Sequence, residues 1–247
     1  MDFIPYIFIA IVGLLSGILT GISGGGGAIL MIPALIFTGL PPQMAVATAK
    51  TSGLGDDFGG LRAFIKSGHI RKDIIKIMIP IAVVVGLITP LVFAAVDNKG
   101  FQIALAIIMI LMLPTLFLKK KTLKRPTKKH KFIGYILYST VLFLQGIFSG
   151  GVGSLAVYVL TLLFGTTKIE TMATRRAVVA VMSPIIVTAL FIGGFVNVGL
   201  ALAGFVTSFI GTMIGTRIIL KRGERFVTVA MAIAILISSV ALLVNAL

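Results

Sequence analysis

Long apolar segments, separated by short polar or basic stretches, follow one another along the whole chain of 247 residues. A helix needs roughly 20 predominantly apolar residues to cross the hydrocarbon core of a bilayer. No alternation of apolar and polar residues persists, so the pattern favours helices over the strands of a membrane barrel. The sequence predicts an all-α integral membrane protein with apolar segments over residues 3–20, 28–40, 42–65, 73–96, 101–118, 132–148, 154–165, 168–193, 197–220 and 226–245.

Two of these segments, 28–40 and 154–165, are short, and each follows a glycine-rich run. The runs are GISGGGG (21–27) and FSGGVG (148–153). Small residues also allow close helix packing, but consecutive glycines weaken any helix, which favours a functional break over packing alone. Short segments of this kind at corresponding places in two halves are typical of transporters with broken helices at the substrate site. We therefore expect Gly-rich broken or re-entrant helices near the bilayer midplane.

The second half of the chain repeats the first when the sequence is shifted by 126 residues. The shift pairs Ser23-Gly24-Gly25 with Ser149-Gly150-Gly151, Gly27 with Gly153, Gly39 with Gly165, Ala47-Thr48 with Ala173-Thr174, and Lys50 with Arg176. Chance seldom brings a glycine run, an Ala-Thr pair and a cation into register together, so the pattern indicates an internal repeat. We predict a first membrane repeat over 1–118, a basic linker over 119–131 and a second membrane repeat over 132–247.

The composition excludes an ordinary soluble domain. The chain is 58% hydrophobic and only 12% charged, whereas soluble domains carry about 25% charged residues. The formal net charge of +15 is concentrated between apolar segments, which is typical of cytoplasmic loops and argues against a nucleic-acid partner. Cysteine is absent, and His69 and His130 both lie in basic loops, so we expect neither a disulfide nor a metal site.

The distribution of lysine and arginine predicts the orientation. Basic loops stay in the cytoplasm, which places residues 62–76, 119–131 and 217–225 there, in a multi-pass protein of the cell membrane. The stretch 193–199 carries no charge, so the second half places its basic loop where the first half has a nearly neutral one. We therefore expect two inverted-topology repeats of about five segments each, because a four-plus-four count would put 217–225 outside. Both termini are then extracellular.

Three cations are predicted to lie deep within apolar segments: Lys50, Arg175 and Arg176. Each lies about 12 Å from the start of its segment, where a lone charge costs about 2.5 kcal/mol or more. Snorkelling to the interface is the alternative interpretation. Helices that begin near Ala28 and Ser154 would aim their positive ends at the same region, which together with the cations indicates an oxyanion site.

The sequence thus gives two sets of candidate residues. The candidates for substrate binding combine the cations with nearby glycines and hydroxyls: Ser23, Gly24, Gly25, Gly26, Thr48, Lys50, Ser149, Gly150, Gly151, Thr174, Arg175 and Arg176. Asp56 and Asp57 are candidates for proton coupling. Asp57 follows Lys50 by seven residues, so both face nearly the same way on a helix. A cytoplasm-facing pair that partners Arg62 is an equal alternative for the two aspartates.

Two stretches resemble the TauE/SafE family of membrane anion exporters. Residues 13–50, GLLSGILTGISGGGGAILMIPALIFTGLPPQMAVATAK, are similar to the first family motif, and residues 146–176 are similar to its second copy. In that copy Val152 interrupts the glycine run, and Val159 stands where the first copy has Pro33. The resemblance implies export of sulfite, sulfoacetate, other organosulfonates or related oxyanions, driven by an ion gradient.

We therefore expect a secondary transporter for a small oxyanion that works by alternating access. A passive anion channel and a non-transporting membrane assembly factor are the alternatives. No enzyme signature is present: GISGGGGA lacks the Lys-Ser/Thr ending of a phosphate-binding loop and follows no strand, so we expect no catalysis and no cofactor. The expected partners are the oxyanion, the lipid bilayer and a coupling ion, H⁺ or Na⁺, and the sequence allows a homodimer.

Overall fold

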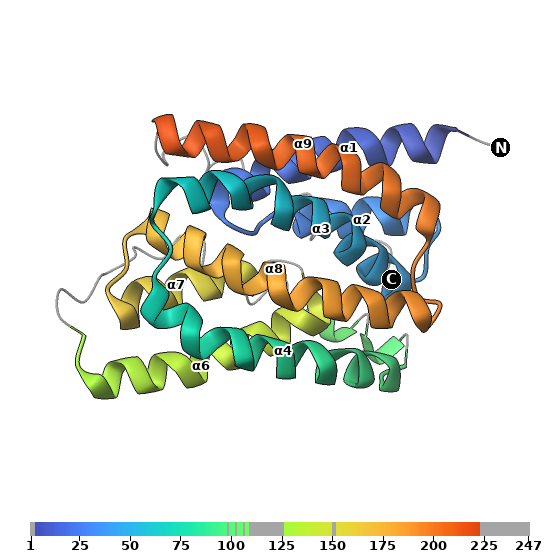
Figure 1. Ribbon diagram of the computed structural model, residues 1–247. Coiled ribbons are helices and arrows are strands. Elements are labelled where there is room, and N and C mark those ends of the chain that lie inside the picture. Colours follow the sequence, from blue (N-terminus) through green and yellow to red (C-terminus); the bar gives the residue numbers. More distant parts are fainter. Residues whose placement is uncertain are drawn as a thin grey trace.

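The computed structural model describes residues 3–97, 99–101, 103–105, 107–108, 126–149 and 152–222, and the regular structure within these ranges is helical. The helices are α1 (Ile4–Ser23), α2 (Ala28–Phe37), α3 (Pro42–Ser67), α4 (Lys72–Ala95), α6 (Lys128–Phe148), α7 (Val152–Phe164), α8 (Lys168–Ile192) and α9 (Val198–Arg222) (Figure 1). The all-α prediction is confirmed. The predicted segment 226–245, residues 109–118 and residues 119–125 of the linker lie outside the described residues.

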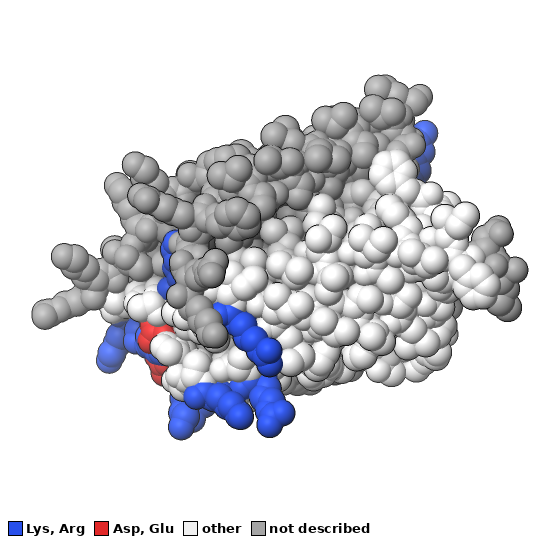
Figure 2. Space-filling view, turned by 90° about the horizontal axis from the view of Figure 1, so that it is seen from above, with Lys and Arg blue, Asp and Glu red and all other residues white. Residues whose placement is uncertain are grey.

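Among the described residues, five helices are long and apolar enough to cross a membrane: α1, α4, α6, α8 and residues 198–220 of α9. Their outer faces carry large apolar side chains such as Leu91, which is 71% exposed, and Leu202, which is 58% exposed. Lysine and arginine side chains gather mainly at one end of the face in Figure 2, a smaller blue patch lies at the opposite end, and the broad face between them carries neither sign of charge. The protein is therefore a multi-pass membrane protein.

The glycine-rich runs interrupt helices as predicted. After α1, Gly24 and Gly25 adopt φ values of 83° and 150°, a region that favours glycine. After α6, Ser149 has a φ of 57°. The helices that follow are short: α2 has 10 residues and α7 has 13.

Capping side chains fix where two of the longer helices begin. Thr127 and His130 form a reciprocal capping box at the start of α6, and Thr167 and Glu170 form another at the start of α8. Helix α6 therefore begins at Lys128, within the predicted linker, instead of at residue 132.

The helices of the two halves correspond under the shift of 126 residues. It carries α1, α2, α3 and α4 onto α6, α7, α8 and α9, and it also carries the main packing contacts onto one another. Helix α1 packs on α9 as α6 packs on α4, and α3 packs on α9 as α8 packs on α4. In Figure 1, α1, α3 and α9 run from right to left, whereas α4, α6 and α8 run from left to right. Corresponding helices thus run in opposite directions.

Two hydrogen bonds between the halves are also related by this shift. The backbone N–H of Arg71, before α4, donates to Thr174 Oγ1 on α8 at 3.0 Å. The backbone N–H of Asn197, before α9, donates to Thr48 Oγ1 on α3 at 3.0 Å. Each bond ties the start of a helix in one half to the central helix of the other half.

Close packing of α1 on α9 depends on small residues. Gly13, Gly17 and Gly21 lie on one face of α1, at the four-residue spacing that lets membrane helices approach. A Cβ atom added to Gly17 would lie 2.8 Å from the Cα of Ser208. A residue larger than glycine therefore has no room for its side chain between α1 and α9.

Candidate substrate-binding site

A cavity of about 80 Å³ lies where α3 meets α8. Because one water needs about 10–15 Å³ of such space, the cavity has room for roughly five to eight water-sized groups. Residues paired by the shift of 126 line it together: Ala49 and Arg175, Gly53 and Val179, Asp56 and Met182, and Asp57 and Ser183. The cavity therefore lies at the contact between equivalent parts of the two halves. Six predicted site residues line it: Gly25, Lys50, Asp56, Asp57, Ser149 and Arg175.

Arg175 lies between the two helix breaks. Its side chain is 5% exposed, and its Nη1 donates to the carbonyl oxygen of Gly24. A Cβ atom added to Gly25 would lie 2.7 Å from Nη1, and one added to Gly153 would lie 2.6 Å from Nη2. The guanidinium thus fills the space beside both glycines, and a side chain at either position would displace it. The shift pairs Arg175 with Ala49, so the first half has no equivalent charge.

Lys50 and Arg176 occupy equivalent positions, and each reaches into the opposite half. Lys50 Nζ donates to the carbonyl oxygen of Gln145, near the end of α6, at 2.8 Å. Arg176 donates to the carbonyl oxygens of Asp56 and Thr20 and lies 5.8 Å from the centre of the Phe64 ring. Lys50 lines the cavity, whereas Arg176 is 2% exposed and lies outside its lining.

The two predicted proton-coupling residues both line the cavity. Asp56 accepts from Thr212 Oγ1 at 2.7 Å and from Thr20 Oγ1 at 3.2 Å, so both of its carboxylate oxygens are occupied. Asp57 accepts at Oδ2 from Ser183 Oγ, its equivalent in the second half, at 2.6 Å. The structure therefore places the pair inside the protein, not as cytoplasm-facing partners of Arg62.

The backbone amides of the first glycine run form hydrogen bonds within the break after α1. Gly25 and Gly26 donate to Ser23 Oγ at 3.3 and 3.0 Å, and Gly27 donates to Thr20 Oγ1 at 3.0 Å. The sequence led us to expect these amides to be free for an anion. Instead, Ser23 and Thr20 already accept from these amides, because the turn folds the glycines back onto hydroxyls near the end of α1.

Several predicted residues lie apart from the cavity. Ser23, Gly24 and Gly26 shape the break after α1, and Thr48 and Thr174 accept from the backbone before α9 and α4. Gly150 and Gly151 lie outside the described residues. The assignment of substrate binding to all these positions stays a prediction.

The structure adds polar residues that sequence reasoning missed. Gln145, Ser183, Ser52 and Ser208 line the cavity. Ser183 could have been identified from the sequence, because the shift of 126 residues pairs it with Asp57. Gln145 is an amide within an otherwise apolar segment just before a glycine run, which also could have marked it.

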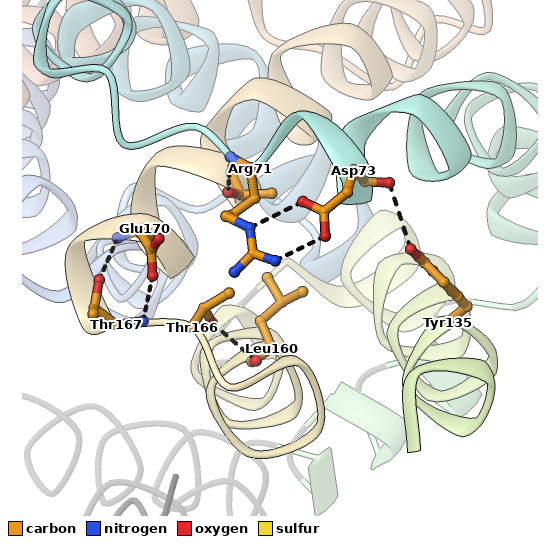
Figure 3. A network of polar contacts seen from close by, with 8 residues as sticks. Arg71, Asp73, Tyr135, Leu160, Thr166, Thr167 and Glu170 are labelled. Atoms are coloured by element: carbon orange, nitrogen blue, oxygen red, sulfur yellow. Dashed lines mark hydrogen bonds and ion pairs between the residues drawn. The ribbon is translucent and has the colours of Figure 1, made fainter. Parts of the chain in front are cut away.

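A second polar cluster includes Arg71, Asp73 and Tyr135, none of which lines the cavity (Figure 3). Arg71 forms an ion pair with Asp73 and donates to it through Nε at 2.9 Å and Nη2 at 2.8 Å. These hydrogen bonds raise the pKa of the Arg71 guanidinium above its ordinary value, with partial burial opposing them. Tyr135 on α6 donates to the carbonyl oxygen of Asp73 at 3.5 Å. The pair is partly exposed, so it contributes little stability on its own.

A multi-pass helical protein with a charged cavity between two helix breaks belongs, by fold and site, to the class of membrane transporters. A family model described as "Sulfite exporter TauE/SafE" matches residues 9–242. The chain belongs to this family, as the two glycine-rich motifs indicated.

Curated relatives agree with the class. A "Probable membrane transporter protein" of Haemophilus influenzae is 26% identical over 223 residues, covering 87% of this chain and 86% of that protein. YfcA of Escherichia coli K12, with the same description, is 25% identical over 236 residues, covering 94% of this chain and 87% of that protein. The "Probable membrane transporter protein ORF9" of Sinorhizobium is 23% identical and covers 93% of this chain and 91% of that protein. The protein is a membrane transporter.

Proposed function

We propose that the protein is a secondary transporter that exports small sulfur-containing oxyanions, such as sulfite, sulfoacetate or other organosulfonates, by alternating access. The observation that carries the proposal is the pair of cations, Lys50 and Arg175, that line one cavity beside the two helix breaks. A buried cation in the membrane is costly, so it needs a compensating partner. Neither Lys50 nor Arg175 has an ion-pair partner within the part of the chain that the structure describes. A bound anion would supply one.

The chemistry of the lining suits a tetrahedral oxyanion. The guanidinium of Arg175 presents several N–H groups in a fixed plane, whereas Lys50 acts as a compact point charge. Ser149 lines the same cavity and offers a hydroxyl. Charge-assisted hydrogen bonds of this kind are shorter and stronger than neutral ones, so a small anion would be held by few contacts.

Alternating access would follow from two inverted-topology repeats of five segments each. The opposite directions of α1 and α6, of α3 and α8, and of α4 and α9 support this architecture. The hydrogen bonds that Thr48 and Thr174 accept support it as well, because the shift of 126 residues carries one bond onto the other. Rocking of one repeat against the other would open the cavity to each side in turn, with residues 62–76, 119–131 and 217–225 in the cytoplasm.

Coupling to an ion gradient would use the carboxylates in the cavity, with H⁺ or Na⁺ as the coupling ion. Asp57 is the better placed of the two, because among the described residues its carboxylate accepts a side-chain hydrogen bond from Ser183 alone, at Oδ2. Asp56 is held at both oxygens by threonine hydroxyls. A proton bound at Asp57 would change the charge of the cavity directly.

The test is efflux of sulfite and sulfoacetate from proteoliposomes, measured for the wild type, Lys50→Ala and Arg175→Ala. Both substitutions are expected to reduce efflux strongly. Arg62→Ala is the matched control, because Arg62 is an exposed cation on the same helix as Lys50. Unchanged efflux in both cavity variants would remove the proposed site. Flux that follows voltage but ignores pH and Na⁺ gradients would instead establish a passive channel.

A further inference from the structure

Each helix break receives a cation from the opposite half. Lys50, on α3, donates to the carbonyl oxygen of Gln145 at 2.8 Å, in the last turn of α6. Arg176, at the equivalent position on α8, donates to the carbonyl oxygen of Thr20 at 3.4 Å, in the last turn of α1. The last carbonyls of a helix form its negative end, so a nearby cation stabilises that end. The two bonds thus hold the ends of the broken helices against the opposite half.

The two cations differ in what else holds them. Arg176 also donates to the carbonyl oxygen of Asp56, lies 5.8 Å from the centre of the Phe64 ring and is 2% exposed. Among the described residues, Lys50 donates to Gln145 alone. Its side chain is half-buried and lines the cavity, whereas Arg176 lies outside the lining. An anion that enters the cavity can therefore reach Lys50 but not Arg176.

The end of α6 can lose the bond to Lys50 without leaving a bare carbonyl. The oxygen of Gln145 also accepts from the backbone N–H of Ser149 at 3.0 Å. The ammonium of Lys50 gains more from an anion than from this neutral carbonyl, because opposite charges attract strongly where water is scarce. The flexible four-carbon side chain of lysine lets the ammonium move from one partner to the other.

Backbone strain lies at the same end of α6. Ser149, the first residue after the helix, has a φ of 57° and a ψ of −56°. A residue with a side chain rarely adopts a positive φ, and such strain persists only where surrounding contacts impose it. After α1 the positive φ values belong to Gly24 and Gly25, which have no Cβ atom to clash. A release of the end of α6 therefore lets a strained break relax.

We propose that an anion bound in the cavity draws Lys50 away from the carbonyl of Gln145 and so frees the end of α6 to move. This inference rests on the proposed function, since it presumes that Lys50 holds the substrate. Arg176 keeps its bonds, so the end of α1 stays fixed to α8. Substrate binding thus starts a movement at the second break and not at the first. The step needs only a negative charge, so it applies to sulfite and to sulfoacetate alike.

Hydrogen–deuterium exchange of the wild-type protein in lipid nanodiscs, with and without saturating sulfoacetate, tests the inference. The amides of residues 146–149 are expected to exchange at least about tenfold faster with sulfoacetate, because the end of α6 loses a bond to a charged group. The equivalent amides of residues 20–23, at the end of α1, are expected to keep their rate. A ligand that only contacts the end of α6 slows exchange there, so the sign of the change distinguishes release from contact.

Two equivalent variants assign the effect to the cations. Lys50→Met removes the ammonium but keeps a long side chain, and it is expected to exchange fast at residues 146–149 without ligand and to show no further rise with sulfoacetate. Arg176→Met is the matched variant and is expected to speed exchange at residues 20–23 instead. Thermal unfolding shows whether each variant folds, and the wild-type comparison decides the inference without them.

Titration calorimetry with sulfoacetate and sulfite separates this inference from the proposed function. Sulfoacetate that binds while exchange at residues 146–149 falls or stays unchanged overturns the release of α6 alone. An equal rise at residues 20–23 overturns the fixed role of Arg176. Exchange in Lys50→Met that equals the ligand-free wild type overturns the bond from Lys50 as the contact that holds the end of α6. A wild-type protein that binds neither anion overturns the proposed function together with the inference.

Discussion

Helices α3 and α8 occupy equivalent places in the two halves, yet they present different chemistry to the cavity. The equivalent lining pairs are Ala49 and Arg175, Gly53 and Val179, Asp56 and Met182, and Asp57 and Ser183. Helix α3 contributes the two carboxylates, whereas α8 contributes the guanidinium. The shared scaffold thus sets where the cavity lies, and the divergence of the two copies sets what it can bind.

Some positions that carry the same residue type or the same charge in both halves connect the halves instead of lining the cavity. Thr48 and Thr174 are identical, and each accepts a hydrogen bond from the backbone before a helix of the other half. Lys50 and Arg176 both remain cationic, but only Lys50 lines the cavity. Positions with shared character therefore include connections between the halves, at Thr48 and Thr174, and cavity-lining residues such as Gly25, Lys50 and Ser149.

The largest expected effect concerns the side of the membrane on which two equivalent positions are exposed. Lys72 and Val198 begin α4 and α9 and are both exposed. The chain contains no cysteine, so single cysteines can be introduced without further changes. We expect a membrane-impermeant maleimide to label Lys72→Cys only from the cytoplasmic side and Val198→Cys only from outside, because the proposed architecture inverts one half relative to the other. Labelling is measured in right-side-out and inside-out vesicles.

Detergent-opened vesicles should label both variants and so serve as the control. Labelling of both positions from the same side would contradict the inverted arrangement, and with it the alternating-access proposal.

The second test concerns the charge that only the second half carries. Arg175→Lys keeps the charge but has no planar fork to bond Gly24 and a ligand at the same time. We expect sulfonate efflux to fall by about 10- to 100-fold, from the loss of hydrogen bonds to a charged group. Efflux kinetics in proteoliposomes measure it. Full activity in Arg175→Lys would show that charge alone suffices.

The third test separates the two carboxylates of α3. Asp57→Asn is expected to abolish the stimulation of efflux by an ion gradient, because Asn cannot exchange a proton in the same way. Asp56→Asn is expected to destabilise the fold by about 1–3 kcal/mol, since one threonine hydroxyl loses its acceptor. Gradient-driven efflux and the thermal unfolding midpoint are measured for both variants. The reverse pattern would exchange the roles assigned to the two residues.

The smallest expected effect concerns the two hydrogen bonds that Thr48 and Thr174 accept from the opposite half. Thr48→Val and Thr174→Val each remove one hydrogen bond to a helix start, so each should cost about 0.5–1.5 kcal/mol of stability. Equivalence of the halves predicts nearly equal losses, measured as the shift in thermal unfolding midpoint. A large loss of stability in one variant alone would show that the two hydrogen bonds are not equivalent.

The sequence predicted the helices of the described residues and the breaks between them, because these follow from local hydrophobicity and from glycine runs. It could not predict which way a side chain turns around its helix. Arg175 and Arg176 are neighbours on α8, yet one faces the cavity and the other bonds carbonyls of α1 and α3. That choice depends on the rotation of α8 against the other half.

The use of polar groups within the site was also beyond local reasoning. The glycine amides after α1 looked available to an anion, but Ser23 and Thr20 lie within reach once the chain turns. Thr48 and Thr174 each accept from a backbone amide of the opposite half, a pairing that the sequence did not indicate, and their role as donors to a ligand stays a prediction. Such pairings form between segments far apart in the sequence, so they become visible only in the folded chain.

The exchanged hydrogen bonds of Thr48 and Thr174 also bear on how such a chain could arise. Each bond needs only a threonine on the third helix of one half and a backbone amide before the fourth helix of the other. Two separate copies of a single half would possess both requirements and would form the same bonds twice across an antiparallel pair. A half-length ancestor could therefore have assembled with itself before gene duplication joined the copies.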